Sequence, residues 1–173
     1  MGGISSFGKT PPMQAAALPR QSEVGTFYGK PGPEIQSRLV MVDLPFPLRL
    51  DWDLAKKVRR VQLHQKCAAA FVTTLTELQA SYGLARLQAL GIDRFAGGYA
   101  HRQMRGGTNW SMHAYGCAVD FYAAPNGLKV RCPDALFCKP EYKDFLDIME
   151  RNGWLPAIRL WGADAMHFQM ARL

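Results

Sequence analysis

The sequence predicts an α+β domain in which helices flank a small antiparallel sheet. Apolar residues recur at helical spacing in two segments, residues 51–83 and 140–152. Between them, residues 95–122 are rich in glycine, aromatic and β-forming residues, which is typical of short strands. A last segment, residues 166–171, alternates like a strand. The order of helix, strands, helix and strand, without an internal repeat, favours this fold class.

The chain has 173 residues, 48% of them hydrophobic, which suits one globular domain. Residues 1–27 are rich in Gly, Pro, Ser and Gln, so we expect a tail or a loosely wrapped arm before a folded domain over residues 28–173. No apolar run approaches the roughly 18 to 20 residues of a membrane span, and residues 1–19 lack the apolar centre of a secretory signal. We therefore expect no stable membrane insertion. We also expect a monomer.

Local signals set the bounds of the predicted elements. Asp51 or Asp53 is a candidate N-cap for the first helix, and Gly83 is its candidate terminator. Residues 44–48 should be extended, because each of their two prolines forces the preceding residue out of the helical region. The pair Gly106 and Gly107 predicts a turn between strands.

The net charge of +7 predicts attraction to an anionic partner. Nucleic acid is not the expected partner, because the basic residues are dispersed and no nucleic-acid motif is present. The densest clusters, residues 56–57 and 59–60, fall on the first predicted helix, where a solvated face is the simpler interpretation. His64 lies near the apolar stripe of the same helix and is interpreted as a core histidine, outside any functional site.

The four cysteines show neither a CxxC pair nor zinc-finger spacing, so they are not predicted to bind metal. Free, buried thiols are the favoured state. Cys132 and Cys138 lie close together in a Pro-containing segment, and they could pair in an oxidising compartment.

Two short strings concentrate the polar residues that carry chemistry. The first runs from Ser111 to Asp120 and the second from Trp161 to Gln169, and they hold two of the four histidines. In the first, a glycine permits a tight turn, after which Asp120 is a polar residue on an otherwise apolar strand. In the second, His167 and Gln169 share one strand face while the alternate residues point to the core.

Two imidazoles and one carboxylate, with a fourth position left for water, form the catalytic pattern of zinc sites, since structural sites close all four positions with protein ligands. We predict that His113, Asp120 and His167 are these ligands. Asp164 is the predicted general acid and base. Arg102 is the predicted partner of the developing oxyanion, because its charge is permanent. The neighbouring His101 could assist, although a surface histidine is the simpler interpretation.

The full strings, SxHxxGxAxD and WxxDxxHFQ, resemble the zinc D-Ala-D-Ala carboxypeptidase and L-alanyl-D-glutamate peptidase family, which shares its fold with the hedgehog signalling domain. The sequences of three segments, residues 97–99, 105–108 and 110–113, are most similar to those of the phage and prophage endolysin branch. The resemblance spans residues 28–173 and implies a hedgehog/DD-peptidase-like fold, one Zn²⁺ ion and the site roles given above. It also implies substrate contacts for three further residues, Ser111, Trp161 and Tyr99.

One departure from the family is the stretch at residues 156–161, where relatives tend to have glycines, and it would alter the pocket wall. The resemblance implies hydrolysis of a peptide bond in the peptidoglycan stem peptide, with L-alanyl-D-glutamate endopeptidase as the first choice. The alternatives are a D-Ala-D-Ala carboxypeptidase and a non-catalytic zinc-containing wall-binding module. Other hydrolase signatures, HExxH, GxSxG and the Walker loop, are missing from the sequence.

The resemblance to endolysins also implies a biological setting. Such a protein would be made in the cytoplasm without a signal peptide and would act on the cell wall in the periplasm. A holin-type partner would first have to permeabilise the membrane. We therefore expect a role in the lysis of a bacterial host by a phage, and antimicrobial activity.

Overall fold

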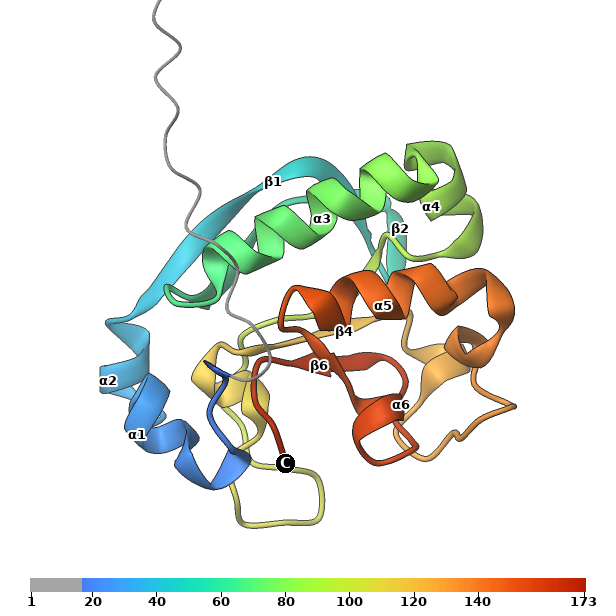
Figure 1. Cartoon of the computed structure of the whole chain (residues 1–173). Helices are drawn as coiled ribbons and strands as arrows, with labels where there is room; N and C mark the ends of the chain where they lie inside the picture. Colours follow the sequence, from blue (N-terminus) through green and yellow to red (C-terminus); the bar gives the residue numbers. More distant parts are fainter. Residues whose placement is uncertain (1–16) are drawn as a thin grey trace, which may run out of the picture.

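The computed structural model describes residues 17–173, so most of the predicted tail lies outside the described residues. Within this range the chain forms a six-stranded sheet in the order β2-β1-β3-β4-β6-β5, in which all neighbours are antiparallel except β1 and β3. Figure 1 shows α3 running along β1, and α5 lying beside α3 near β4 and β6. The predicted α+β class is confirmed.

The first two strands form a long hairpin. β1 (Leu39–Leu50) and β2 (Asp53–His64) pair with Val42 opposite Val61, and the register shifts between Asp43 and Leu48. The shift falls on the proline-containing residues that were predicted to be extended, and this prediction is confirmed. Proline cannot donate a ladder hydrogen bond, so an irregularity at this point is expected.

The hairpin corrects the prediction of a helix over residues 51–83. Only its second part is helical, as α3 (Ala68–Tyr82), and Gly83 follows it as predicted. Residues 53–64 are strand β2, because their apolar residues Val58 and Val61 find partners on β1. A short apolar run fits both periods, and only the long-range pairing decides between them. The basic residues 56–57 and 59–60 therefore lie on an edge strand and not on a helix.

The second half of the chain builds the centre of the sheet. Its strands are β3 (Arg94–Gly97), β4 (Ala118–Phe121), β5 (Leu155–Pro156) and β6 (His167–Gln169), and its helices are α4 (Leu84–Leu90), α5 (Lys143–Arg151) and α6 (Ala157–Leu160). The turn η6 (Pro140–Tyr142) leads into α5, so the predicted helix over residues 140–152 is confirmed. The predicted strand near the C-terminus is confirmed as β6.

One face of β4 and β6 belongs to the hydrophobic core. Val119, Phe121 and Phe168 are fully buried, and the rings of Phe71 and Phe145 pack against Phe121. Aromatic side chains of this size bury enough apolar area to dominate the stability of a small core. Because successive side chains alternate across a strand, the opposite face of the same two strands is left for polar residues.

The described part of the predicted arm packs on the domain. It consists of η2 (Gln21–Glu23), α1 (Val24–Tyr28) and, beyond the predicted boundary, α2 (Pro33–Gln36). Leu18 and Tyr28 are buried, and the Tyr28 hydroxyl donates to the carbonyl of Met170 at 2.7 Å. The arm thereby ties the start of the described chain to its C-terminal end.

The cysteines differ from the favoured expectation of four free thiols. Cys132 and Cys138 form a disulfide with their Cα atoms 5.6 Å apart, whereas Cys67 and Cys117 are free and buried. A turn that includes η5 (Leu136–Cys138) brings the two paired residues together. In residues 17–173, no helix combines the length and the apolar character needed to cross a membrane.

Candidate metal centre

Three of the predicted site residues come from three adjoining pieces of backbone. Asp120 on β4 lies directly opposite His167 on β6 in the antiparallel register. His113 lies in η3 (Met112–Tyr115), whose N-cap Ser111 accepts a hydrogen bond from the His113 backbone N–H at 3.3 Å. Gly116 ends this turn in the left-handed conformation, and a Cβ there would meet the His64 backbone nitrogen at 2.6 Å. Local turn chemistry therefore aims His113 at the strand pair.

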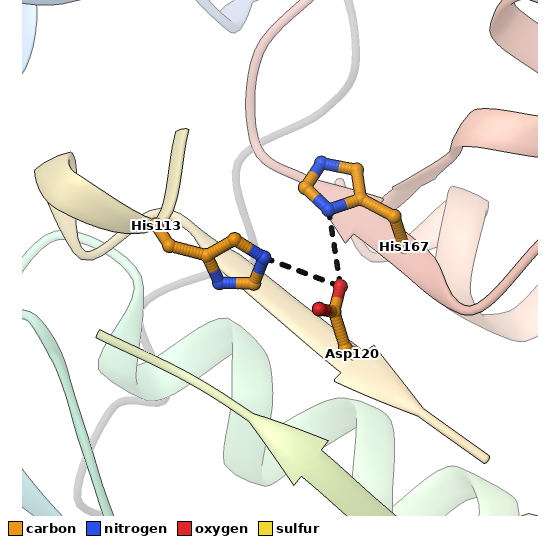
Figure 2. A group of neighbouring side chains, drawn as sticks. All are labelled: His113, Asp120 and His167. Carbon is orange, nitrogen blue, oxygen red and sulfur yellow. Dashed lines mark hydrogen bonds and ion pairs between the residues drawn. The ribbon is translucent and has the colours of Figure 1, made fainter. Parts of the chain in front are cut away.

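The three side chains converge on one carboxylate oxygen (Figure 2). His113 Nε2 lies 3.2 Å from Asp120 Oδ1, and His167 Nδ1 lies 3.1 Å from the same oxygen. One possible ligand atom from each residue lies within 4.8 Å of the others, and both imidazoles are buried. The set has the donor types of a zinc site, two nitrogens and one oxygen.

The outer nitrogen of His113 fixes the tautomer of that ring. Its Nδ1 lies 2.8 Å from the carbonyl oxygen of Gly98, which can only accept a hydrogen bond. Nδ1 must therefore carry the proton, and a neutral His113 presents the lone pair of Nε2 to Asp120. Nε2 is buried and has no hydrogen-bond partner of adequate geometry within residues 17–173.

Gln169 fixes His167 in the same way. The Gln169 Nε2 amide donates to the carbonyl of Ala171 at 3.0 Å, which turns the Gln169 Oε1 atom toward His167. His167 Nε2 lies 3.0 Å from that oxygen and must donate to it. A neutral His167 therefore presents the lone pair of Nδ1 to Asp120.

With both imidazoles neutral, two nitrogen lone pairs and a carboxylate oxygen face one another in a buried space, an arrangement that a bound metal cation would satisfy. Burial by itself raises the pKa of Asp120, but interactions with His113 and His167 in their protonated forms outweigh burial and hold that pKa well below the usual range. The carboxylate is therefore charged at neutral pH. The residues fit a zinc ion, with a carbonyl or an amide orienting each imidazole from behind, as is common around metal-binding histidines.

Asp164 lies in the loop before β6, in the same pocket. Its side chain is buried, its Oδ1 atom has no hydrogen-bond partner among the described residues, and burial raises its pKa. A carboxyl group with a raised pKa holds a proton more readily than a free carboxyl group, which suits a residue that takes up and releases a proton. The position therefore fits the predicted acid and base role.

The pocket over the centre has a volume of about 260 Å³. It brings together seven of the eight predicted site residues: Arg102, Ser111, His113, Asp120, Trp161, Asp164 and His167. Arg102 is exposed at the pocket, and the Trp161 ring lies 5.9 Å from the ring of His167. The exception is Tyr99, which packs against the hydrophobic core and does not line the pocket. The catalytic and substrate roles of these residues stay predictions.

Sequence reasoning missed several contributors to the site. Gln169 appears in the quoted motif without a role, although its place two residues after His167 puts both on one strand face. The role of the Gly98 carbonyl could not be predicted from the sequence, because every residue has a backbone carbonyl. Arg105 and three apolar residues, Met104, Leu128 and Met166, also line the pocket. His101 is exposed and stacks on Trp110 with 4.6 Å between ring centres, as expected for a surface histidine.

Comparison with known proteins agrees with this geometry. Residues 105–170 match the model of a family described as D-alanyl-D-alanine carboxypeptidase, a family of zinc peptidases. The matched segment includes His113, Asp120, Asp164 and His167. No curated protein and no solved structure matches the chain. The predicted family resemblance is confirmed over residues 105–170, and the match supports a zinc peptidase that acts on peptidoglycan without distinguishing an endopeptidase from a carboxypeptidase.

Proposed function

We propose, from the family match and from the resemblance of the motifs to endolysin peptidases, that the chain is a zinc-dependent endopeptidase that hydrolyses the L-alanyl-D-glutamate bond of the peptidoglycan stem peptide. One observation carries the hydrolase assignment: one possible ligand atom each from His113, Asp120 and His167 lies within 4.8 Å of the others, and the buried carboxyl group of Asp164 lines the same pocket. A structural metal site would need neither the pocket nor the second carboxylate.

The side chains of the pocket divide the work of peptide hydrolysis. Zinc, held by His113, Asp120 and His167, would supply a Lewis acid and lower the pKa of water. Asp164 accepts the proton of the attacking water and returns it to the leaving amine, which its raised pKa allows. Arg102 binds the negative charge that develops on the carbonyl oxygen.

The pocket lining suits a short peptide with acidic groups. Arg102 and Arg105 bring two permanent charges, which can bind carboxylates of the stem peptide. Met104, Leu128 and Trp161 offer an apolar wall for the aliphatic parts of the chain. A substrate with both carboxylate and aliphatic groups is therefore accommodated.

The second candidate is a D-Ala-D-Ala carboxypeptidase, which the description of the matching family favours. It would use the same metal and base but would bind a free terminal carboxylate. A non-catalytic wall-binding module is less well supported, because it would need neither Asp164 nor Arg102 beside the metal ligands.

We also place the activity in phage-driven lysis of a bacterial host, on the resemblance of the motifs to endolysins. The net charge of +7 would provide weak adhesion to an anionic wall. The protein would act as a monomer on the periplasmic wall, after a holin-type partner has opened the membrane.

The deciding experiment is digestion of isolated sacculi by the purified protein, with and without a chelator, followed by mass spectrometry of the products. We expect zinc-dependent release of stem peptides cut after L-alanine. Release of single D-alanine residues would instead establish the carboxypeptidase. Products that are unchanged by removal of zinc would contradict the proposed chemistry.

A further inference from the structure

We infer that the Cys132–Cys138 disulfide holds Asp164 in its working position, so that reduction of this bond lowers hydrolysis while the fold and the metal site stay in place. The inference rests on the proposed function for the role of Asp164. The structural part, a tether between the disulfide loop (residues 131–138) and the Asp164 loop (residues 161–166), stands on contacts that are independent of that role.

The first contact lies at the start of the disulfide loop. Arg131, directly before Cys132, forms an isolated antiparallel bridge with Ala163, directly before Asp164. The Arg131 guanidinium also donates to the Gly162 carbonyl at 3.5 Å. The position of Cys132 therefore sets the position of the residues that lead into Asp164.

The second contact lies at the other end of the disulfide loop and passes through the fully buried Asn126. The backbone N–H of Phe137, directly before Cys138, donates to the Asn126 side-chain oxygen at 2.8 Å. The carbonyl of Asn126 in turn accepts the backbone N–H of Met166 at 3.0 Å. The disulfide thus joins two short segments that hold the Asp164 loop from both sides.

Asp164 needs such support. It has a φ of 62°, a left-handed conformation that costs free energy for any residue with a Cβ and persists only when its surroundings enforce it. Its Oδ1 atom has no hydrogen-bond partner within residues 17–173. The backbone tethers therefore carry much of the positioning of this carboxylate.

Reduction would act on one of the two contacts more than on the other. Ala135 and Phe137 are fully buried in the core and keep the second half of the disulfide loop in place without the bond. Arg131, Cys132 and Pro133 are exposed, and they are held to the second half of the loop by the disulfide and by one backbone hydrogen bond, from the Ala135 N–H to the Arg131 carbonyl at 2.9 Å. We therefore expect the bridge between Arg131 and Ala163 to loosen, while the contact through Asn126 remains.

The bond can be reached by a reductant, because Cys132 is exposed and Cys138 is only partly buried. Two molecules of a small thiol each give one electron and one proton. The sulfur–sulfur bond breaks, two cysteine thiols form, and the reductant leaves as its own disulfide. An enzyme kept in a reducing compartment would then be less active than the same enzyme in an oxidising one.

The activity test compares the oxidised protein, the protein treated with a phosphine reductant, and the double variant Cys132→Ser with Cys138→Ser. A phosphine replaces a dithiol because dithiols bind zinc. We expect reduction and the double variant each to lower kcat by about 10- to 100-fold, with the zinc content unchanged, because a misplacement of about 1 Å can cost on the order of 100-fold. The reductant should have no effect on the double variant, and Asp134→Ala in the same exposed loop should behave like the parent.

A second measurement does not depend on hydrolysis. In NMR spectra of the zinc-loaded protein, reduction should shift the amide signals of Gly162, Ala163 and Asp164 and speed their hydrogen exchange, while the Met166 amide stays protected. Unchanged signals at these three residues would overturn the tether. Loss of these signals' protection without any loss of kcat would overturn the positioning role. A protein whose oxidised form cuts no wall at all, yet shows the NMR change, would contradict the proposed function and not the tether.

Discussion

The chain buries histidines in two regions, and the two differ in what their second ring nitrogen faces. His64, at the end of β2, has both nitrogens satisfied by the backbone: Nε2 lies 2.9 Å from the Tyr28 carbonyl, and Nδ1 accepts the Lys66 backbone N–H at 3.0 Å. His113 and His167 each have one nitrogen satisfied by an acceptor and the other aimed at Asp120.

The difference separates a structural histidine from a candidate metal ligand. A buried imidazole with one donor and one acceptor partner is neutral, and both of its ring nitrogens are hydrogen-bonded. A buried neutral imidazole whose lone pair faces a carboxylate has one nitrogen without a donor, and a bound metal cation would satisfy both groups. Burial and sequence context do not make this distinction, since all three histidines are buried. Only the partners of the two nitrogens do.

The largest expected effect is loss of the metal. His113→Ala removes one of three ligands, so we expect the zinc content to fall from close to one ion per chain to near zero, with loss of hydrolysis. Elemental analysis of the purified variant measures this. His64→Ala is the matched control and should keep its zinc. Equal zinc content in His113→Ala and His64→Ala would contradict the proposed difference between the two regions.

The next effect separates the metal from the chemistry. Asp164→Ala should keep zinc and abolish hydrolysis, and Asp164→Asn should lower kcat by about 100- to 10,000-fold, the usual contribution of a positioned acid or base. Turnover of sacculi at equal zinc occupancy is the measurement. A variant that digests the wall as well as the parent shows that another group moves the proton.

A smaller effect concerns the orientation of His167. Gln169→Leu removes the acceptor of His167 Nε2, so the ring can adopt the other tautomer. We expect zinc affinity to fall by about 10- to 100-fold, as is typical when a partner of a metal-binding histidine is lost. Competition with a chelator of known affinity measures it. Gln169→Glu keeps an acceptor and should lie between the parent and the leucine variant. Parent-like affinity in Gln169→Leu would contradict the tautomer assignment.

The smallest expected effect concerns His64, whose role is structural. His64→Ala leaves the Lys66 backbone N–H without its partner and removes one of two donors to the Tyr28 carbonyl, which still accepts from Arg38 at 2.8 Å. We expect a loss of about 1 to 3 kcal/mol in the free energy of unfolding, at unchanged zinc-dependent kcat. Chemical denaturation of the zinc-loaded proteins measures the first quantity. A loss of zinc or activity in this variant would show that His64 belongs to the site.

His64 also predicts a pH dependence. Burial lowers its pKa, so the folded protein takes up this proton less readily than the unfolded chain, in which the pKa is about 6.5. The stability from neutral His64 is present above that value and is lost as the pH falls toward the lower folded pKa. The parent should therefore lose more stability than His64→Gln between about pH 7.5 and about pH 5.5. Equal losses of stability in the parent and in His64→Gln would contradict this pH dependence.

Prediction from the sequence was accurate where the signal is local. The helix at residues 140–152, the last strand and the extended proline segment are set by neighbouring residues, and the structure has them. The helix predicted over residues 51–83 failed in its first part, because its apolar residues pair with β1, which precedes them in the chain. The disulfide was left open, since closeness in sequence does not fix whether two cysteines can meet.

The sequence by itself identified the candidates for the chemistry: His113, Asp120, Asp164 and His167 stand in two short strings, and strand alternation placed Asp120 and His167 each on the polar face of its strand. The tertiary structure decided how they can do it. Register between β4 and β6 set Asp120 opposite His167, and contacts from Gly98 and Gln169 set the tautomers. Such facts depend on atoms distant along the chain or on carbonyls that every residue carries, so no local pattern encodes them.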